Sequence, residues 1–220
     1  MIDTIIKLWS KYDYVYIDGL LGTLWLAAVT VMAATAVGTI IALMRLSGVR
    51  LLDRFTVLYI GVLRGTPILL QLYFFWLTLP KISPITLSDT ACIVIALIVN
   101  ASAYVAEVIR AGIQAVDKGQ KEAAKSLGLS DRNTFRYIVF PQAIKNILPA
   151  LGNEYITMVK QTSLASVFFV QELMTSYRTV QSATFLAIPS LVIVGVIYLV
   201  VTTILSKGLN LFERRLQRNE

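Results

Sequence analysis

The sequence contains no histidine and only one cysteine, Cys92, among its 220 residues. Histidine is the commonest metal ligand in proteins and the side chain best suited to general base catalysis near neutral pH. A single cysteine permits no disulfide within the chain. We therefore expect no metal site and no redox chemistry, and a hydrolytic enzyme would lack its usual base.

Charged residues are also scarce. Asp, Glu, Lys and Arg make up 15% of the chain and hydrophobic residues 56%, whereas typical soluble domains carry about 25% charged residues. Apolar runs of about 20 residues recur, and each is long enough to cross a ~30 Å hydrocarbon core as a helix. Because lipid offers the backbone no hydrogen-bond partners, such runs form helices. The composition predicts an all-α integral membrane protein with one transmembrane domain over residues 1–220.

Five apolar segments are expected to span the membrane: residues 19–46, 55–79, 87–111, 144–170 and 185–209. Most of the 20 basic residues fall after the first span, after the third span, or in the tail that includes Arg214, Arg215 and Arg218. The positive-inside rule then places the N-terminus outside and the C-terminus in the cytoplasm. This rule also accounts for the net charge of +7, so we expect no nucleic-acid partner. Residues 1–18 are expected to be either an interfacial helix on the outer surface or a frayed extension.

The loop after the third span carries the polar stretch EAAKSLGLSDRNTFRYIVFP, residues 122–141. Good helix formers occupy residues 120–127, and Gly128 is placed to end that helix in a left-handed cap. Ser130 can cap a second short helix, and Pro141 is expected to interrupt the chain before the fourth span. The residues alone leave two interpretations open: a projecting cytoplasmic helix pair, or a solvated connector.

Three polar residues are expected near the membrane midplane and are candidates for substrate binding: Arg64, Asn100 and Glu154. Charges at this depth are costly and usually mark a pathway or a buried partner. Arg64 and Glu154 can form a salt bridge between two helices. Alternatively, they bind opposite ends of a zwitterionic ligand, with the carboxylate on Arg64 and a cationic group on Glu154.

The string RGTP, residues 64–67, predicts a kink or an unwound turn in the second span, because proline lacks an N–H. The freed N–H groups of Gly65 and Thr66 would be available to a carboxylate. On the fourth span, Thr157 and Gln161 share a helical face with Glu154 and either line a pathway or bond neighbouring helices. Near the cytoplasmic end of the third span, Glu107 and Arg110 are spaced for an ion pair.

Several strings together resemble one known family. EAAKSLG followed by IVFP resembles the EAA loop in the membrane subunits of ABC importers, although Phe140 stands where leucine is more usual. RGTP, AYVAEVIRAGI at residues 103–113 and MVKQTSL at residues 158–164 narrow the resemblance to the polar amino acid branch. These strings are spread over residues 64–164.

The resemblance implies a permease subunit of an ATP-driven amino acid importer in the bacterial cytoplasmic (inner) membrane. A coupling helix in the EAA loop, about residues 112–143, would dock on a cytoplasmic ABC ATPase dimer through Glu122, Ala123, Ala124 and Gly128. The other expected partners are membrane lipid, a second permease copy or a homologous permease, and an extracytoplasmic amino acid binding protein. An acidic residue in the NEYITM region, here Glu154, is similar to the one that recognises cationic side chains, which implies arginine, lysine or histidine as substrates.

The chain contains no G-x-x-x-x-G-K-[ST] string, so ATP and Mg would be bound by the partner ATPase, with no cofactor in this chain. A channel or secondary carrier, with Arg64 and Glu154 as gating or ion-coupling charges, is the alternative. That alternative leaves the EAA loop unexplained. A membrane-embedded enzyme is disfavoured because no nucleophile and base are matched in depth.

Overall fold

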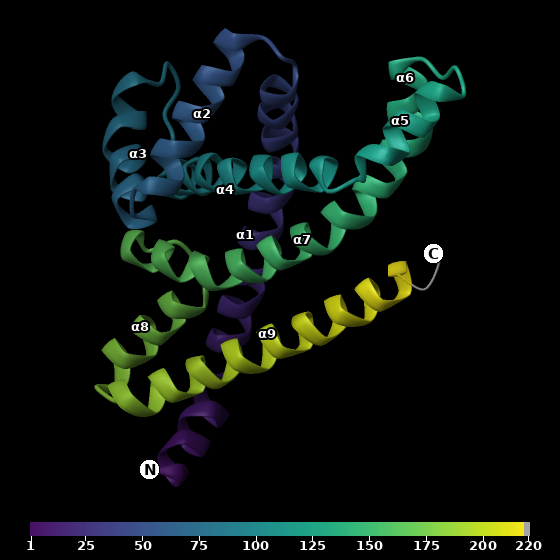
Figure 1. The fold of residues 1–220 in the computed structure, drawn as a ribbon. Coiled ribbons are helices and arrows are strands. Elements are labelled where there is room, and N and C mark those ends of the chain that lie inside the picture. Colours follow the sequence, from purple (N-terminus) through teal and green to yellow (C-terminus); the bar gives the residue numbers. More distant parts are fainter. Residues whose placement is uncertain (218–220) are drawn as a thin grey trace.

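The computed structural model describes residues 1–217 and contains only helices within them, which confirms the all-α prediction. Arg218 of the tail lies outside these residues. The α-helices are α1 (Ile2–Leu46), α2 (Arg50–Gly65), α3 (Ile68–Ile82), α4 (Asp89–Gln114), α5 (Lys118–Ser126), α6 (Asp131–Thr134), α7 (Phe140–Gln161), α8 (Leu173–Thr184) and α9 (Ala187–Gln217) (Figure 1). A π-helical turn, η1 (Phe135–Val139), joins α6 to α7, and a 3₁₀ helix, η2 (Thr162–Phe168), follows α7.

Three helices of the described chain, α1, α4 and α9, are each long and apolar enough to cross a membrane. Helices α2 and α3 meet this condition only together, as one span bent by 108°. Helix α7 carries Lys145, Glu154 and Lys160 and is not among the apolar spans. The number of five spans and their orientation therefore stay predictions.

The N-terminal segment is helical and continues directly into the first expected span as helix α1. Only Tyr12 departs from helical geometry, with φ −126° and ψ 16°. Of the two alternatives for residues 1–18, the helix is the one found. Its position at the membrane surface stays a prediction.

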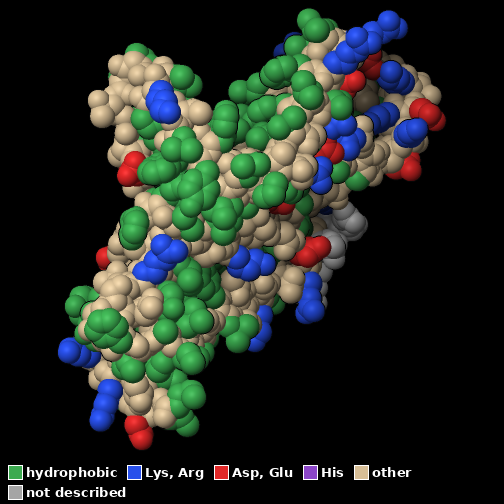
Figure 2. Space-filling model, turned by 90° about the vertical axis from the view of Figure 1, so that its left-hand side faces the viewer, with side chains coloured by type: hydrophobic (Ala, Val, Ile, Leu, Met, Phe, Trp, Pro, Cys, Tyr) green, Lys and Arg blue, Asp and Glu red, His purple; other side chains and the backbone are tan. Residues whose placement is uncertain are grey.

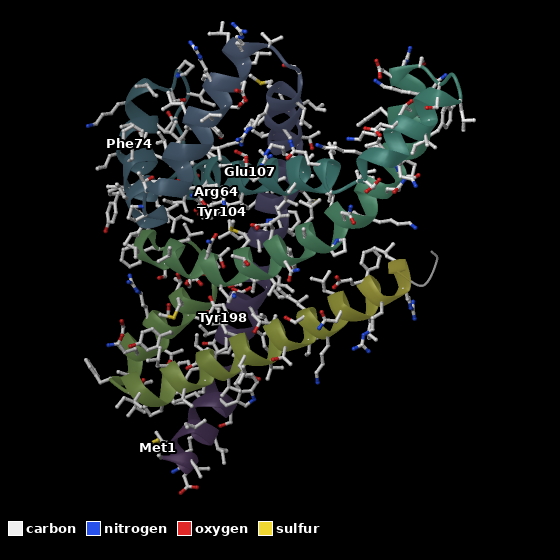
Figure 3. All side chains as sticks on the ribbon, viewed as in Figure 1. Met1, Arg64, Phe74, Tyr104, Glu107 and Tyr198 are labelled. Carbon is white, nitrogen blue, oxygen red and sulfur yellow. The ribbon has the colours of Figure 1, made fainter. Side chains whose placement is uncertain are left out.

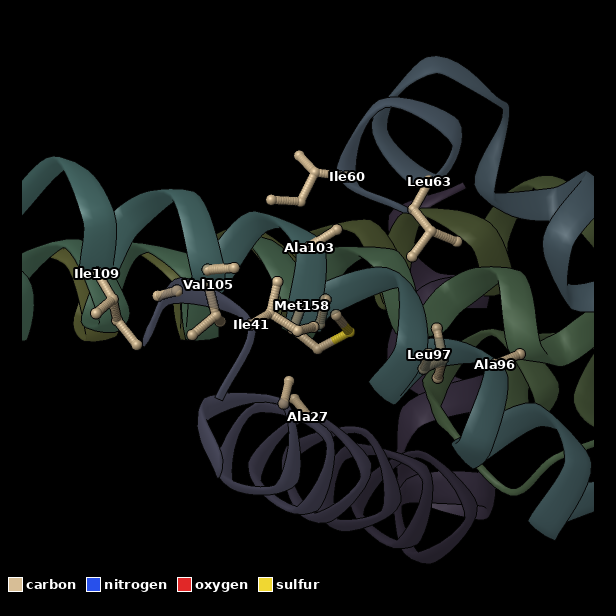
Figure 4. Packing of buried hydrophobic residues seen from close by; sticks show 14 of the residues in the cluster. Ala27, Ile41, Ile60, Leu63, Ala96, Leu97, Ala103, Val105, Ile109 and Met158 are labelled. Atoms are coloured by element: carbon tan, nitrogen blue, oxygen red, sulfur yellow. The ribbon is translucent and has the colours of Figure 1, made fainter. Parts of the chain in front are cut away.

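Helices α1, α4 and α7 surround the main hydrophobic core, where Ile41, Val105 and Met158 meet (Figure 4). Helix α1 crosses behind α4, α7 and α9, which lie one below the other in Figure 1. Gly38 sets the distance between α1 and α4, because a Cβ added there would lie 2.9 Å from the carbonyl oxygen of Ser102. Small residues at such crossings let two backbones approach closely in a membrane.

The polar stretch after α4 forms a helical hairpin of α5 and α6, so of the two alternatives the helix pair is the one found. Gly128 has φ +83°, and its N–H donates to the Lys125 carbonyl at 2.9 Å, which closes α5 with the expected left-handed cap. The Ser130 hydroxyl accepts from the Asn133 N–H at 3.4 Å and caps α6, again as predicted.

The expected interruption at Pro141 is wrong, because the chain stays helical from α6 through η1 into α7. Proline is tolerated in the first turn of a helix, where its missing N–H is not needed. Pro141 occupies such a position in α7, and the wider π-helical turn lies just before it. The hairpin and α7 therefore form one continuous helical path.

Candidate functional site

The predicted break in the second span is confirmed. Helix α2 ends at Gly65, Thr66 and Pro67 are extended, and α3 starts at Ile68. Proline disfavours the helical conformation in the residue before it, which explains the extended Thr66. A Cβ added to Gly65 would meet nothing within 4 Å, so open space adjoins the break.

Gln71 and Asn100 lie behind the break and are both buried. The side-chain N–H groups of Gln71 donate to the Leu63 carbonyl at 2.8 Å and to the Thr66 hydroxyl at 2.8 Å. Asn100 on α4 donates to the Gln71 side-chain oxygen at 2.9 Å. The Asn100 amide, predicted to touch substrate, thus bonds within the protein and is 2% exposed. Gln71 was not predicted, although it is the only side chain in the run ILLQLYFFW that is neither aliphatic nor aromatic.

Arg64 is the last charged residue of α2 and lies at the edge of the break. Its guanidinium sits over the Tyr104 ring, 5.2 Å from the centroid, and one of its nitrogens lies 3.9 Å from a carboxylate oxygen of Glu107. Figure 3 shows Arg64, Tyr104 and Glu107 next to one another. The Arg64 side chain remains 45% exposed, so it stays accessible from the open side of the break.

Glu107 on α4 is the centre of a cluster of arginines. The expected ion pair with Arg110 is confirmed, at 2.8 Å. Glu107 also pairs with Arg45 at the end of α1, which the sequence did not predict. The cluster ties the last turn of α1 to α4, with Arg64 of α2 as its most distant member.

Helix α7 turns Glu154, Thr157 and Gln161 away from the core, since all three are half-buried while Met158 and Val159 are buried. Within residues 1–217, Glu154 accepts no hydrogen bond and forms no ion pair with Arg64. The first alternative for these two charges, a direct salt bridge, is therefore absent from residues 1–217.

The hairpin of α5 and α6 lies at the end of α7 that is remote from α8 (Figure 1). Of its predicted coupling residues, Glu122, Ala123 and Gly128 are exposed, whereas Ala124 is buried within the hairpin. Leu127 is 81% exposed beside them, and Lys125 pairs with Asp131 at 2.7 Å. In Figure 2 charged side chains gather at one corner, while hydrophobic side chains cover much of the remaining face. The hairpin is thus a polar projection with one exposed leucine.

The chain matches the family model described as binding-protein-dependent transport system inner membrane component, over residues 34–218. It is 36% identical over 204 residues to the arginine transport system permease protein ArtQ of Bacillus subtilis, a match that covers 93% of each chain. It is 33% identical over 202 residues to the glutamine transport system permease protein GlnP of Escherichia coli K12, covering 91% of this chain and 92% of that protein.

Among solved structures, the chain resembles the crystal structure of an amino acid ABC transporter with histidines. The TM-score is 0.89 at 44% identity, over 94% of this chain and 96% of that one. The methionine ABC transporter MetNI shares the fold, with a TM-score of 0.73 at 16% identity over 92% of this chain. The chain therefore belongs to the family of binding-protein-dependent transport system inner membrane components, as a multi-pass permease subunit of an ABC transporter whose ATP hydrolysis resides in a separate chain.

Proposed function

We propose that this chain is the permease subunit of an ATP-driven importer of polar amino acids and that basic amino acids are its preferred substrates. One observation carries the proposal: Arg64 at the break and Glu154 on α7 carry opposite charges, and no ion pair joins them within the described residues. A basic amino acid brings a carboxylate and a cationic side chain, which match these two charges. The names of the relatives, arginine and glutamine permeases, support an amino acid substrate.

Arg64 and the N–H groups of Gly65 and Thr66 would hold the substrate carboxylate. In other transporters the N-terminal ends of broken helices bind anionic groups, because their first backbone N–H groups are unpaired. Here that end belongs to α3, which starts just after Thr66 and Pro67, whereas Gly65 ends α2. Glu154 would hold the cationic end, with Thr157 and Gln161 lining the same face of α7. Asn100, which lies behind the break, would support this arrangement rather than complete it.

The hairpin would couple the permease to its ATPase. Glu122, Ala123 and the cap at Gly128 would dock on a cytoplasmic ABC ATPase dimer that binds ATP and Mg, with Ala124 packed inside the hairpin. A second copy or a homologous permease would complete the path, and an extracytoplasmic binding protein would deliver the amino acid. The whole chain would act as one transmembrane domain of the bacterial cytoplasmic membrane, with the hairpin and the C-terminus inside.

The test is uptake of radiolabelled arginine and glutamine by the full complex, with its ATPase and binding protein, in proteoliposomes. We expect Glu154→Gln to lower arginine uptake at least about tenfold and to affect glutamine much less, because a hydrogen bond to a charged group contributes roughly 1.5–3 kcal/mol. Asp53→Asn, a change of an exposed acid on α2, serves as the control. Equal losses for both amino acids would remove Glu154 as the selectivity residue. Uptake that persists without ATP would favour the ATP-independent carrier instead.

A further inference from the structure

The break between α2 and α3 leaves backbone carbonyls without helical partners. The last four carbonyls of a helix have none, and at membrane depth water does not replace them. The Val62 carbonyl accepts from the Thr66 hydroxyl at 2.8 Å. The Leu63 carbonyl has no such local donor and depends on side chains that come from α3 and α4.

Gln71 supplies most of this support. Its Nε2 lies 2.8 Å from the Leu63 carbonyl, 3.2 Å from the Thr66 carbonyl and 2.8 Å from the Thr66 hydroxyl. Carbonyl oxygens only accept hydrogen bonds, so these contacts fix which end of the amide faces the break. Asn100 holds the other end, because it donates to Gln71 Oε1 at 2.9 Å.

The two residues that Gln71 binds flank Arg64 and Gly65. Gln71 therefore fixes the backbone on both sides of the residues proposed to hold the substrate carboxylate. The Arg64 side chain has no short contact of its own, since its nearest carboxylate is 3.9 Å away. Beyond these looser contacts to Tyr104 and Glu107, its placement depends on the backbone that carries it.

We propose that Gln71 is a positioning residue for substrate binding, that it acts through Arg64, and that Asn100 acts through Gln71 without touching the substrate. This inference rests on the proposed function, because it takes Arg64 as the ligand of the carboxylate. Gln71 is 7% exposed, so its side chain is committed to the break. Buried polar networks of this kind are stabilising only when every member is satisfied.

The experiment measures binding of radiolabelled arginine to the purified permease–ATPase complex in nanodiscs. The variants are Arg64→Gln, Gln71→Met and the double variant. Methionine keeps the length of glutamine and fills the space without any donor. Gln142→Met is the matched control, since Gln142, in the first turn of α7, donates to the Ile138 carbonyl four residues earlier and lies far along the chain from the break.

We expect Arg64→Gln to weaken arginine binding at least about tenfold, because it removes a charge-assisted contact. Gln71→Met should weaken binding about three- to tenfold, as loss of one or two hydrogen bonds implies. The double variant should match Arg64→Gln within about twofold, because residues that act through one another are not additive. The control should bind arginine as the unmodified complex does.

Asn100→Leu provides a second variant in case Gln71→Met fails to assemble, and it should show the same dependence on Arg64 with a smaller effect. The melting temperature of each complex is measured alongside. A purely structural role of Gln71 would lower the melting temperature, and the effect of Gln71→Met on binding would then add to that of Arg64→Gln. The inference is overturned, and the proposed function stands, if Arg64→Gln weakens arginine binding but Gln71→Met does not. The same holds if the losses caused by the two variants are additive in the double variant. If Arg64→Gln leaves binding unchanged, Arg64 is not the carboxylate ligand, and both fail.

Discussion

Arg64 lies over the ring of Tyr104 and 3.9 Å from Glu107, so both groups that hold this cation belong to α4. Neither contact is tight. Glu107 is already paired with Arg45 and Arg110, and it remains neutralised when Arg64 moves away. The resting contacts of Arg64 are therefore compatible with its transfer to another carboxylate.

The arginine cluster predicts a strong effect of Glu107→Gln on stability. The change leaves Arg45, Arg64 and Arg110 with no shared carboxylate, and removing one partner of a buried ionic group typically costs about 3–5 kcal/mol. Because these side chains are partly exposed, we expect a smaller loss, about 1–3 kcal/mol in the free energy of unfolding. Unfolding of the detergent-solubilised protein in SDS measures it, with Asp53→Asn as control. An unchanged midpoint would show that the arginines are solvated independently of Glu107.

Replacing Gly38 or Gly61 by alanine is expected to change the stability of the protein in opposite directions. Alanine at Gly38 places a Cβ 2.9 Å from the Ser102 carbonyl and forces α1 and α4 apart, which typically costs about 1–3 kcal/mol. Alanine at Gly61 meets nothing within 4 Å and should stabilise α2 by about 0.5–1 kcal/mol. The same SDS unfolding assay compares the two variants. A loss of stability at Gly61, or none at Gly38, would contradict the packing described for these helices.

Gly128→Ala tests the cap that ends α5. With φ +83°, an alanine there costs about 1–2 kcal/mol of local stability. We expect faster hydrogen exchange at the Leu129 amide, which bonds to the Ala124 carbonyl at 3.1 Å, and weaker stimulation of ATP hydrolysis by substrate in the full complex. Gly208→Ala in α9 is the control, because its added Cβ meets nothing. Normal coupling despite faster exchange would mean that the hairpin binds its partner without a preformed cap.

The features that depend on neighbouring residues were predictable from the sequence. The break at RGTP, the cap at Gly128 and the cap at Ser130 each follow from the conformational limits of proline, glycine or serine, and the structure has all three. Pro141 was misread because a position in the first turn of a helix tolerates proline.

Contacts between distant segments were not predictable. Arg45 and Glu107 are 62 residues apart, and no local pattern relates them. The ion pair between Glu107 and Arg110 was predictable only because the two residues share one helix. Asn100 was identified only by its expected depth in the membrane. Depth indicates that a polar side chain needs a partner, but it does not tell whether that partner is a ligand or a group of the protein such as the Leu63 carbonyl or the Gln71 side chain.

The continuous helical path from α6 through η1 into α7 has a mechanical consequence. Residues 131–161 run without an intervening loop from the base of the exposed hairpin to the turn beyond Glu154. A helix resists compression and bending far more than a loop does, so a push or a twist applied at the hairpin end moves Glu154 with it. If the hairpin docks on the ATPase as proposed, this helical path would act as a lever, with the hairpin at one end and Glu154 near the other.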